Sequence, residues 1–186
     1  MNFKRIVPMA HDLLAARVQV GDAVVDATAG NGHDTVFLAQ RVGETGQVYT
    51  FDIQHKAIEN TRNKLEAAGL SARAKLCLRC HSEIAHTVAE PIQAAVFNLG
   101  YLPGSDKRVA TKPDTTVEAI SAALSILNVG GIVVIVLYRG HRGGREEAAA
   151  VEQYVRTLSP ARYTVLKYEY INLLNDPPYI LAVESH

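Results

Sequence analysis

An acid and two glycines near the start of the chain have the types and spacing of a ligand-binding loop. In Val24–Thr35 an apolar run is followed by Asp26, and Gly30 and Gly32 come shortly after it. Glycine permits positive φ and lets a ligand approach the backbone without meeting a Cβ. The stretch has no Lys or Arg, and it lacks the third glycine of Gly-x-Gly-x-x-Gly and the Gly-Lys-Ser/Thr of a phosphate loop. It therefore favours a cationic or zwitterionic ligand over a pyrophosphate.

A second acid, Asp52, ends the apolar stretch Val48–Phe51. In nucleotide-binding βαβ units, an acid at the tip of the second strand binds the ribose hydroxyls of an adenosine. Asp26, the glycine loop and Asp52 together resemble the first two motifs of class I S-adenosylmethionine-dependent methyltransferases. The alternative, that the glycines only form a tight turn for packing, is less favoured because Asp52 follows at the expected place.

Asn98 and Tyr101 follow a third apolar stretch, Ala94–Phe97, with the spacing of the Asn/Asp-Pro-Pro-Tyr motif of amino-group methyltransferases. An amine that attacks a methyl sulfonium must aim its lone pair at the methyl carbon. A carboxamide oxygen and backbone carbonyls can hold the amine N–H groups in that pose, while an aromatic ring packs against a base. The alternative is a plain loop with a turn at Pro103-Gly104; an Asn directly after a buried strand favours the functional interpretation.

Basic residues gather after a further apolar run, in residues 138–147, which hold three arginines and a histidine among glycines. Such a loop can bind phosphates, and Lys107, Arg108 and Lys112 are expected on the same rim. A solvated basic loop is an equally good interpretation of any single residue. A literal Asp-Pro-Pro-Tyr at residues 176–179 precedes the last strand, and it predicts a rigid turn that borders the substrate pocket.

Strands that alternate with helices must position these residues, and this alternation predicts a doubly wound, mostly parallel α/β sheet. The last two strands have no helix between them and predict an antiparallel edge hairpin. Residues 1–20 predict an amphipathic helix packed on the sheet, and His11 within it is interpreted as a surface or capping residue. The expected strands are 23–26, 47–52, 73–79, 94–97, 132–137, 163–170 and 179–184. The expected helices are 33–41, 55–68, 82–89, 115–128 and 143–158.

The length of 186 residues predicts one domain, residues 1–186. The formal net charge is zero, so any RNA binding must come from local patches. Cys77 and Cys80 form Cys-x-x-Cys, but a zinc site needs two more ligands, so reduced thiols and no metal are expected. No signal peptide or apolar run of membrane-spanning length is visible, and the protein is expected to be cytoplasmic.

Five stretches together resemble one family, the small bacterial methyltransferases long labelled rRNA methylases (YtqB-like). They are Val25–Thr35, Phe51–Gln54, Phe97–Lys107, Gly140-His141 with Gly144, and Asn175–Pro178. Members of that family are assigned as tRNA 5-aminomethyl-2-thiouridine methyltransferases. The resemblance implies a Rossmann-like class I fold with seven strands, S-adenosylmethionine as cofactor, and methyl transfer to the aminomethyl group of a wobble uridine or 2-thiouridine. It also implies a tRNA substrate, read as an anticodon stem-loop.

The resemblance and the strand ends together give three sets of expected site residues. The catalytic residues are Asn98 and Tyr101. The cofactor-binding residues are Asp26, Thr28, Gly30, Asn31, Gly32, His33, Asp34, Thr35, Asp52, Ile53, Gln54, His81, Ser82, Asn98, Leu99 and Gly100. The substrate-binding residues are Leu102, Pro103, Gly104, Lys107, Tyr138, Gly140, His141, Arg142, Arg145, Asn175 and Pro177.

Several alternatives stay open. The substrate could be rRNA or a small-molecule amine, or the chain could be a module that binds S-adenosylmethionine or RNA without catalysis. The missing third glycine disfavours an NAD-dependent dehydrogenase. His33, Asp34 and His141 are candidate bases for the amine, but positioning of the neutral amine by Asn98 is the favoured mechanism. The sequence does not decide between a monomer and a homodimer.

Overall fold

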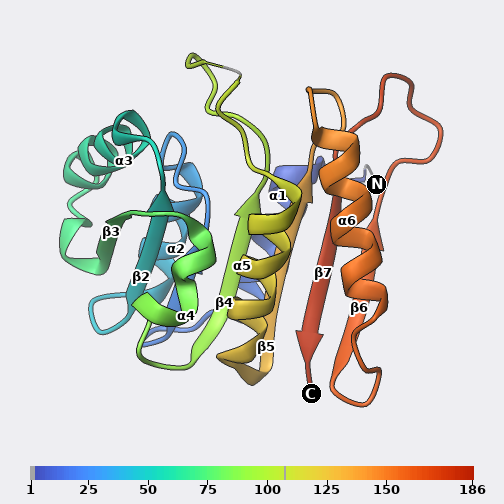
Figure 1. Cartoon of the computed structure of the whole chain (residues 1–186). Coiled ribbons are helices and arrows are strands. Elements are labelled where there is room, and N and C mark those ends of the chain that lie inside the picture. Colours follow the sequence, from blue (N-terminus) through green and yellow to red (C-terminus); the bar gives the residue numbers. More distant parts are fainter. Residues whose placement is uncertain (1–2, 107) are drawn as a thin grey trace.

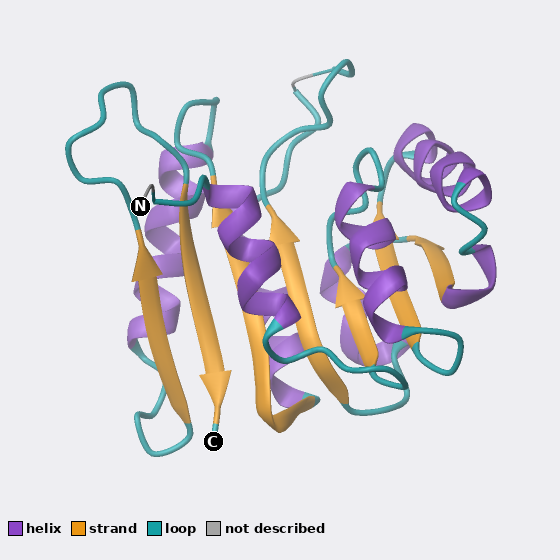
Figure 2. Ribbon diagram, turned by 180° about the vertical axis from the view of Figure 1, so that it is seen from behind, coloured by secondary structure: helices purple, strands orange, loops and turns teal. Residues whose placement is uncertain are grey.

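A seven-stranded sheet runs through the middle of the protein, with helices on both of its faces (Figures 1 and 2). The computed structural model describes residues 3–106 and 108–186. The strands are β1 (Ala23–Asp26), β2 (Gln47–Asp52), β3 (Ala74–Leu78), β4 (Ile92–Asn98), β5 (Leu127–Leu137), β6 (Tyr163–Tyr168) and β7 (Tyr179–Ser185). Their order is β3-β2-β1-β4-β5-β7-β6, parallel except for β7, which is antiparallel to both of its neighbours. This confirms the predicted doubly wound sheet with an antiparallel edge hairpin.

The helices form two layers, one on each face of the sheet. The helices are α1 (Ile6–Ala15), α2 (His33–Val42), α3 (His55–Ala67), α4 (Ile84–Thr87), α5 (Pro113–Ser125) and α6 (Gly144–Arg156), with 3₁₀ turns η1 (Ser71–Arg73) and η2 (His81–Glu83). Buried residues of α1, α2 and α3 form one apolar core with the sheet, and those of α4, α5 and α6 form the other. Two faces covered by helices explain why β1, β4 and β5 contain continuous apolar runs instead of alternating ones.

Strand β5 shows how the two cores share the sheet. Val133 and Ile135 point into the core under α5 and α6, while Val134 and Val136 point into the core under α1 and α2. All four are at most 1% exposed. Because successive strand residues face opposite sides, a strand that is apolar at every position fits only the middle of a three-layer fold.

The largest difference from the expected elements lies between α5 and β5. The expected helix 115–128 is instead α5, which begins at Pro113, a residue well suited to the first helical position. The chain is already extended at Leu127, which pairs with Ile92, and the register shifts before Ile132. Gly130 and Gly131 therefore do not end the helix but lie in an irregular stretch of β5. Both positions require glycine, because Gly130 has φ +77° and a Cβ on Gly131 would lie 2.9 Å from two carbonyl oxygens.

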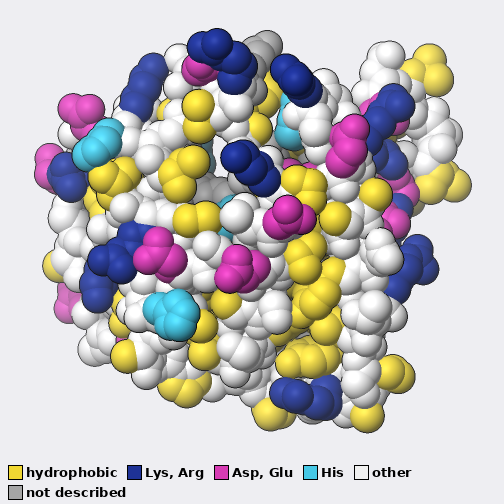
Figure 3. Space-filling model, viewed as in Figure 1, with side chains coloured by type: hydrophobic (Ala, Val, Ile, Leu, Met, Phe, Trp, Pro, Cys, Tyr) yellow, Lys and Arg dark blue, Asp and Glu magenta, His cyan; other side chains and the backbone are white. Residues whose placement is uncertain are grey.

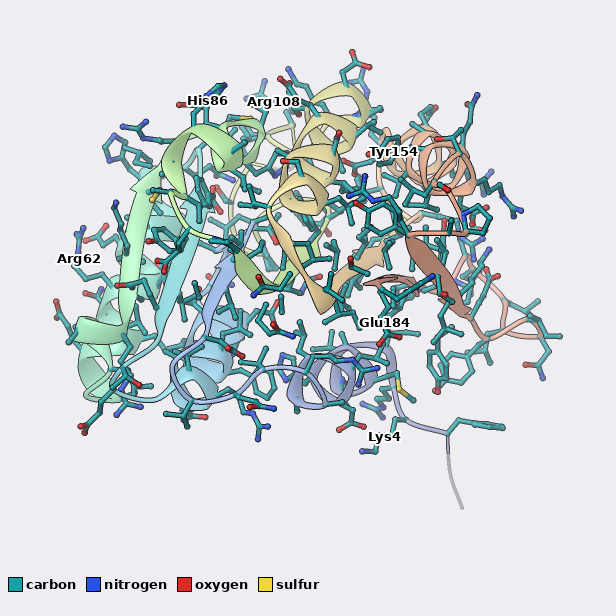
Figure 4. All side chains as sticks on the ribbon, turned by 90° about the horizontal axis from the view of Figure 1, so that it is seen from below. Lys4, Arg62, His86, Arg108, Tyr154 and Glu184 are labelled. Carbon is teal, nitrogen blue, oxygen red and sulfur yellow. The ribbon has the colours of Figure 1, made fainter. Side chains whose placement is uncertain are left out.

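Helix α1 is fixed to strands from the other end of the chain. The Arg17 guanidinium, just after the helix, binds the Glu184 carboxylate of β7 with Nε at 3.0 Å. The hydroxyls of Tyr168 and Tyr170 both donate to the carbonyl oxygen of Lys4, at 2.8 and 2.5 Å. Figure 4 shows Lys4 and Glu184 on the same side of the sheet as α1. In the described part of the chain, no helix has the length and apolar character needed to cross a membrane.

Candidate functional site

A cavity of about 610 Å³ opens at the carboxyl ends of the parallel strands, above β1, β2 and β4. Strands β1 and β4 lie where the strand order reverses, and ligands of open α/β sheets bind at this point. Three connections rise around it, after β4, β5 and β6 (Figure 1). The volume lies within the range of small-molecule and cofactor pockets, about 300–1,000 Å³.

Asp26 is fully buried beneath the glycine loop and does not line the cavity. Its carboxylate accepts hydrogen bonds from the Thr28 backbone N–H at 3.1 Å and from the Thr35 hydroxyl at 2.6 Å. Burial, with a further contribution from the charge of Asp34, raises the pKa of Asp26 to about 7. Asp26 therefore supports the glycine loop from beneath. The expected direct contact with a cofactor is replaced by an indirect one, through the loop.

The two glycines of the loop have different reasons for being glycine. Gly30 has φ +52°, lines the cavity, and donates its N–H to the Asp52 carboxylate at 3.1 Å. Gly32 has φ +77°, and a Cβ there would lie 2.8 Å from the Cα of Thr61 in α3. Gly30 thus fits the ligand-binding interpretation, and Gly32 fits the packing interpretation.

Asp52 lies at the cavity wall, where each carboxylate oxygen already accepts one backbone N–H. Oδ1 accepts from Gln54 at 2.9 Å and Oδ2 from Gly30 at 3.1 Å. Burial raises the pKa of Asp52, while these backbone hydrogen bonds act in the opposite direction. Ile53 beside it is exposed and also lines the cavity. An acid next to an apolar side chain is the arrangement that suits a ribose and an adenine ring.

His81 closes the cavity at the end of β3. Its Nδ1 lies 3.2 Å from the Ala27 carbonyl oxygen, and burial lowers its pKa. A neutral imidazole next to a carbonyl must donate from Nδ1, so Nε2 becomes the hydrogen-bond acceptor. Ser82 does not line the cavity.

Asn98 ends β4 and is held at two points. Its backbone N–H donates to the Thr28 hydroxyl at 2.8 Å, and its side-chain Nδ2 donates to the Asp34 Oδ2 at 3.0 Å. A carboxylate can only accept hydrogen bonds, so the amide nitrogen must be the atom that faces Asp34. This leaves the carboxamide oxygen as the group that Asn98 offers to a ligand in the cavity.

The loop after β4 is tied to helix α6 through a buried acid. The Gly100 backbone N–H donates to the Thr111 hydroxyl at 3.0 Å, and that hydroxyl donates to Glu147 at 2.7 Å. Glu147 is 1% exposed and also accepts the Thr116 hydroxyl at 2.6 Å. Tyr101 bridges to Ala110 across the same loop. Glu147 therefore holds the base of the loop that carries Tyr101.

The arginines near the cavity are mostly paired with acids, which the sequence did not indicate. Arg139 binds Glu169 at 2.8 Å, Arg145 binds Asp176, and Arg108 binds Asp106 at 2.7 Å. Arg142 is exposed, and Figure 3 shows Lys and Arg side chains along the upper edge of the molecule. Lys107 lies outside the described residues. The predicted basic rim is thus partly neutralised by its own acids.

Most expected site residues line this one cavity. Those that do are Thr28, Gly30, Asn31, His33, Asp34, Asp52, Ile53, Gln54, His81, Asn98, Leu99, Gly100, Tyr101, Leu102, Pro103, Tyr138, Gly140 and His141. Those that do not are Asp26, Gly32, Thr35, Ser82, Gly104, Arg142, Arg145, Asn175 and Pro177. Asn175 and Pro177 flank Asp176, which does line it, so the turn at 176–179 borders the cavity as expected.

Several lining residues were missed from the sequence. They are Ala27, Ala29, Arg79, Cys80, Val109, Ala110, Thr111 and Thr115. Val109, Ala110 and Thr111 lie in the long loop after β4, where no periodic pattern indicates which side chains turn inward. Lys112, Arg139 and Asp176 also line the cavity, in agreement with the expected basic rim and bordering turn. His11 and Glu147 were also missed; they contact cavity residues from behind, and only the folded chain brings them there. Among the described residues, no group of three or more His, Cys, Asp or Glu side chains could hold a metal ion.

The sheet order and the position of the cavity define the class I methyltransferase fold. Residues 48–184 match the model of the family described as "Putative rRNA methylase", and the chain belongs to this family. A crystal structure of a protein from Clostridium thermocellum described by the same name is 40% identical and superimposes with a TM-score of 0.98 over the full length of both chains.

Two further relatives extend the comparison. A methyltransferase structure from Streptococcus mutans, in complex with SAH, is 39% identical, with a TM-score of 0.92 over the full length of both chains. A chloroplast "tRNA (mnm5s2U34)-methyltransferase" of Arabidopsis thaliana is 39% identical over 180 residues, which cover 91% of this chain. The chain spans 65% of the length of that plant relative.

The raised pKa of Asp26 predicts a distinct pH dependence of stability. Because the folded-state value of about 7 lies above the unfolded value of 3.8, the native state holds the proton longer than the unfolded state does. The free energy of unfolding then falls as pH rises from about 4 to about 7, as far as this group is concerned. Asp26→Asn should remove this pH-dependent contribution. Between about pH 4 and 7, the free energy of unfolding of the wild type, measured by urea titration, should therefore fall relative to that of the variant. A difference between the two proteins that is flat with pH would contradict the assignment.

Proposed function

We propose that this protein transfers a methyl group from S-adenosylmethionine to the amine of a 5-aminomethyl group on the wobble uridine, or 2-thiouridine, of tRNA. The observation that carries the proposal is the Asn98 carboxamide, oriented by Asp34 beside a cavity that Asp52 and the glycine loop also line. The SAH bound to the Streptococcus mutans relative and the name of the plant relative support the cofactor and the substrate.

The cavity residues fit the chemistry of the cofactor. Asp52 is placed to accept hydrogen bonds from ribose hydroxyls, and Ile53 offers an apolar surface for the adenine ring. The glycine loop has no Lys or Arg, and the acids Asp34 and Asp52, which line the cavity, favour a positively charged ligand at this end of the sheet. When bound, S-adenosylmethionine supplies a methyl group on a positively charged sulfur.

The chain contributes position more than acid–base chemistry. The Asn98 Oδ1 accepts an N–H of the neutral amine and thereby aims the nitrogen lone pair toward the cofactor side of the cavity. Tyr101, at the rim, offers a ring against which the uracil can pack. Reactions that depend on orientation lose rate steeply when this geometry is disturbed, by about 10²-fold for a misplacement of 1 Å.

The rim of the cavity suits a single-stranded RNA loop. The loops after β4, β5 and β6 surround the opening, and Lys112, Tyr138 and His141 line it from two of them. Proteins read RNA in loops by splaying out bases, stacking them on aromatic rings, and contacting the backbone with cations. The wobble base of an anticodon loop is such a base. Exposed Arg142 is available for a phosphate.

Mass spectrometry of tRNA nucleosides tests the proposal directly. The purified protein, incubated with S-adenosylmethionine and tRNA that carries the 5-aminomethyl group, should convert that nucleoside to the 5-methylaminomethyl form, a gain of one methyl. Matched tRNA without the aminomethyl group should gain none. Methylation of the second tRNA, or of rRNA alone, would instead assign the site to another nucleic-acid substrate.

Removal of the Asp52 carboxylate should chiefly weaken cofactor binding. Asp52→Ala loses the ribose contacts and also frees the Gly30 N–H, so the Kd for S-adenosylmethionine should rise by about 100-fold, since hydrogen bonds to a charged group contribute about 1.5–3 kcal/mol each. Isothermal titration calorimetry measures this change. An unchanged Kd would exclude Asp52 from the cofactor site.

Removal of the Asn98 carboxamide should instead abolish turnover. Asn98→Ala keeps the backbone N–H that binds Thr28, so the loop stays in place and S-adenosylmethionine should bind with nearly the wild-type Kd. The rate of methyl transfer should fall by at least about 10²-fold because the amine is no longer oriented. If cofactor affinity and turnover fell together, Asn98 would be a cofactor-binding residue and not an orienting one.

A further inference from the structure

His11 contacts the site from behind, although it lies on the N-terminal helix and outside the cavity. Its Nε2 is 2.7 Å from the Asp34 Oδ1, and its ring stacks on Phe37 of α2 with centroids 4.0 Å apart and an interplanar angle of 5°. The Asp34 side chain is only 8% exposed. His11 therefore reaches an acid at the base of α2 whose charge is largely removed from water.

Asp34 uses its two oxygens for two different partners. Oδ1 pairs with His11, and Oδ2 accepts the Nδ2 of Asn98 at 3.0 Å. Three side chains from α1, α2 and β4 thus form a continuous row, His11–Asp34–Asn98, that ends at the cavity. A shift of the Asp34 carboxylate would therefore also move the Asn98 side chain.

Asp34 needs a partner that keeps it in place. Burial is the main cause of the raised pKa of Asp26 and of Tyr138, and the charge of nearby Asp34 raises both values further. Charge on Asp26 is therefore unfavourable beside the Asp34 carboxylate. Among the described residues, the hydrogen-bond partners of the Asp34 carboxylate are His11 and Asn98 alone. Without the N–H of His11, the Oδ1 atom would be free to turn, and the hydrogen bond that sets the Asn98 amide would lose its direction.

Docking of α1 does not require the imidazole. The helix is attached by the buried side chains of Ile6, Ala10 and Leu14, by Arg17 with Glu184, and by the carbonyl of Lys4. The stacking of His11 on Phe37 could be provided by any flat ring. Only a hydrogen-bond donor at position 11 can make the contact with Asp34.

We propose that His11 is a positioning residue that acts through Asp34 to hold the Asn98 carboxamide oxygen toward the methyl-accepting amine. This rests on the proposed function for the reaction itself, but the row of hydrogen bonds is a property of the protein alone. His11 does not touch substrate or cofactor. Its contribution is to the rate of the transfer step and not to the binding of either reactant.

Two substitutions at position 11 separate the hydrogen bond from the packing. His11→Phe keeps the stack on Phe37 and removes the donor, and His11→Gln removes the ring and keeps an N–H donor. With tRNA carrying the aminomethyl group, His11→Phe should lower kcat by about 10-fold or more, while KM for tRNA and the Kd for S-adenosylmethionine stay within about twofold. His11→Gln should recover most of the lost rate.

A matched histidine elsewhere provides the control. His86 is exposed, and Figure 4 shows it on the opposite side of the sheet from α1. His86→Phe should leave all three constants unchanged. A wild-type kcat in His11→Phe, or a His11→Gln variant as slow as His11→Phe, would overturn the proposal.

A measurement on the free protein distinguishes failure of this inference from failure of the proposed function. If the wild-type protein methylates no aminomethylated tRNA, the proposed function fails, whatever His11 does. In that case, the side-chain N–H signals of Asn98 in ¹⁵N NMR spectra still test whether His11 fixes the Asn98 amide through Asp34. Their exchange with water should be slow in the wild type and in His11→Gln, and clearly faster in His11→Phe. Equal exchange in all three proteins would show that His11 does not fix the amide.

Discussion

Two hydrogen bonds from Asn98 join the two halves of the site, from its backbone N–H to the Thr28 hydroxyl at 2.8 Å and from its Nδ2 to Asp34 at 3.0 Å. Thr28 belongs to the loop after β1, on the side of the cavity proposed for the cofactor, and Asn98 ends β4, on the side proposed for the methyl acceptor. Because β1 and β4 are adjacent parallel strands with Asp26 opposite Val96, Thr28 and Asn98 each lie two residues beyond the same register position. The register of this one strand pair therefore brings Thr28 and Asn98 together beside the cavity.

Buried acids without a paired arginine or lysine are the second constraint. Asp26 is satisfied by a hydroxyl and an N–H, and Glu147 by two hydroxyls. Neutral donors stabilise a buried carboxylate less than a cation does, and burial raises the pKa of Asp26 to about 7. Arg139 and Arg145, near the opening of the cavity, are in turn paired with Glu169 and Asp176. The buried acids thus lack cationic partners among the described residues, while these two arginines have acidic ones.

Local sequence patterns were enough to predict the strands, the sheet class and the acids at the strand ends. Asp52 and Asn98 were recognisable because each follows an apolar run that can only be a buried strand. His11 was interpreted as a surface residue because its helix gives no indication of which side chain of α2 it will meet. Thr111 and Glu147 were not recognised for the same reason, since they are 36 positions apart in the chain and are joined only by the packing of α6 on the loop. The pairing of Arg139 and Arg145 was not recognised because their acidic partners, Glu169 and Asp176, come later in the chain, after β6.

The attachment of α1 to the last strands has a consequence for the order in which the molecule forms. The partners that hold its ends, Tyr168, Tyr170 and Glu184, follow Lys4 and Arg17 by 164 to 167 positions in the chain. Chains fold from the N-terminus as they emerge, so strands β1 to β4 can pair while α1 still lacks these anchors. Until β6 and β7 have been added, a nascent polypeptide holds the helix that carries His11 without its attachments at either end.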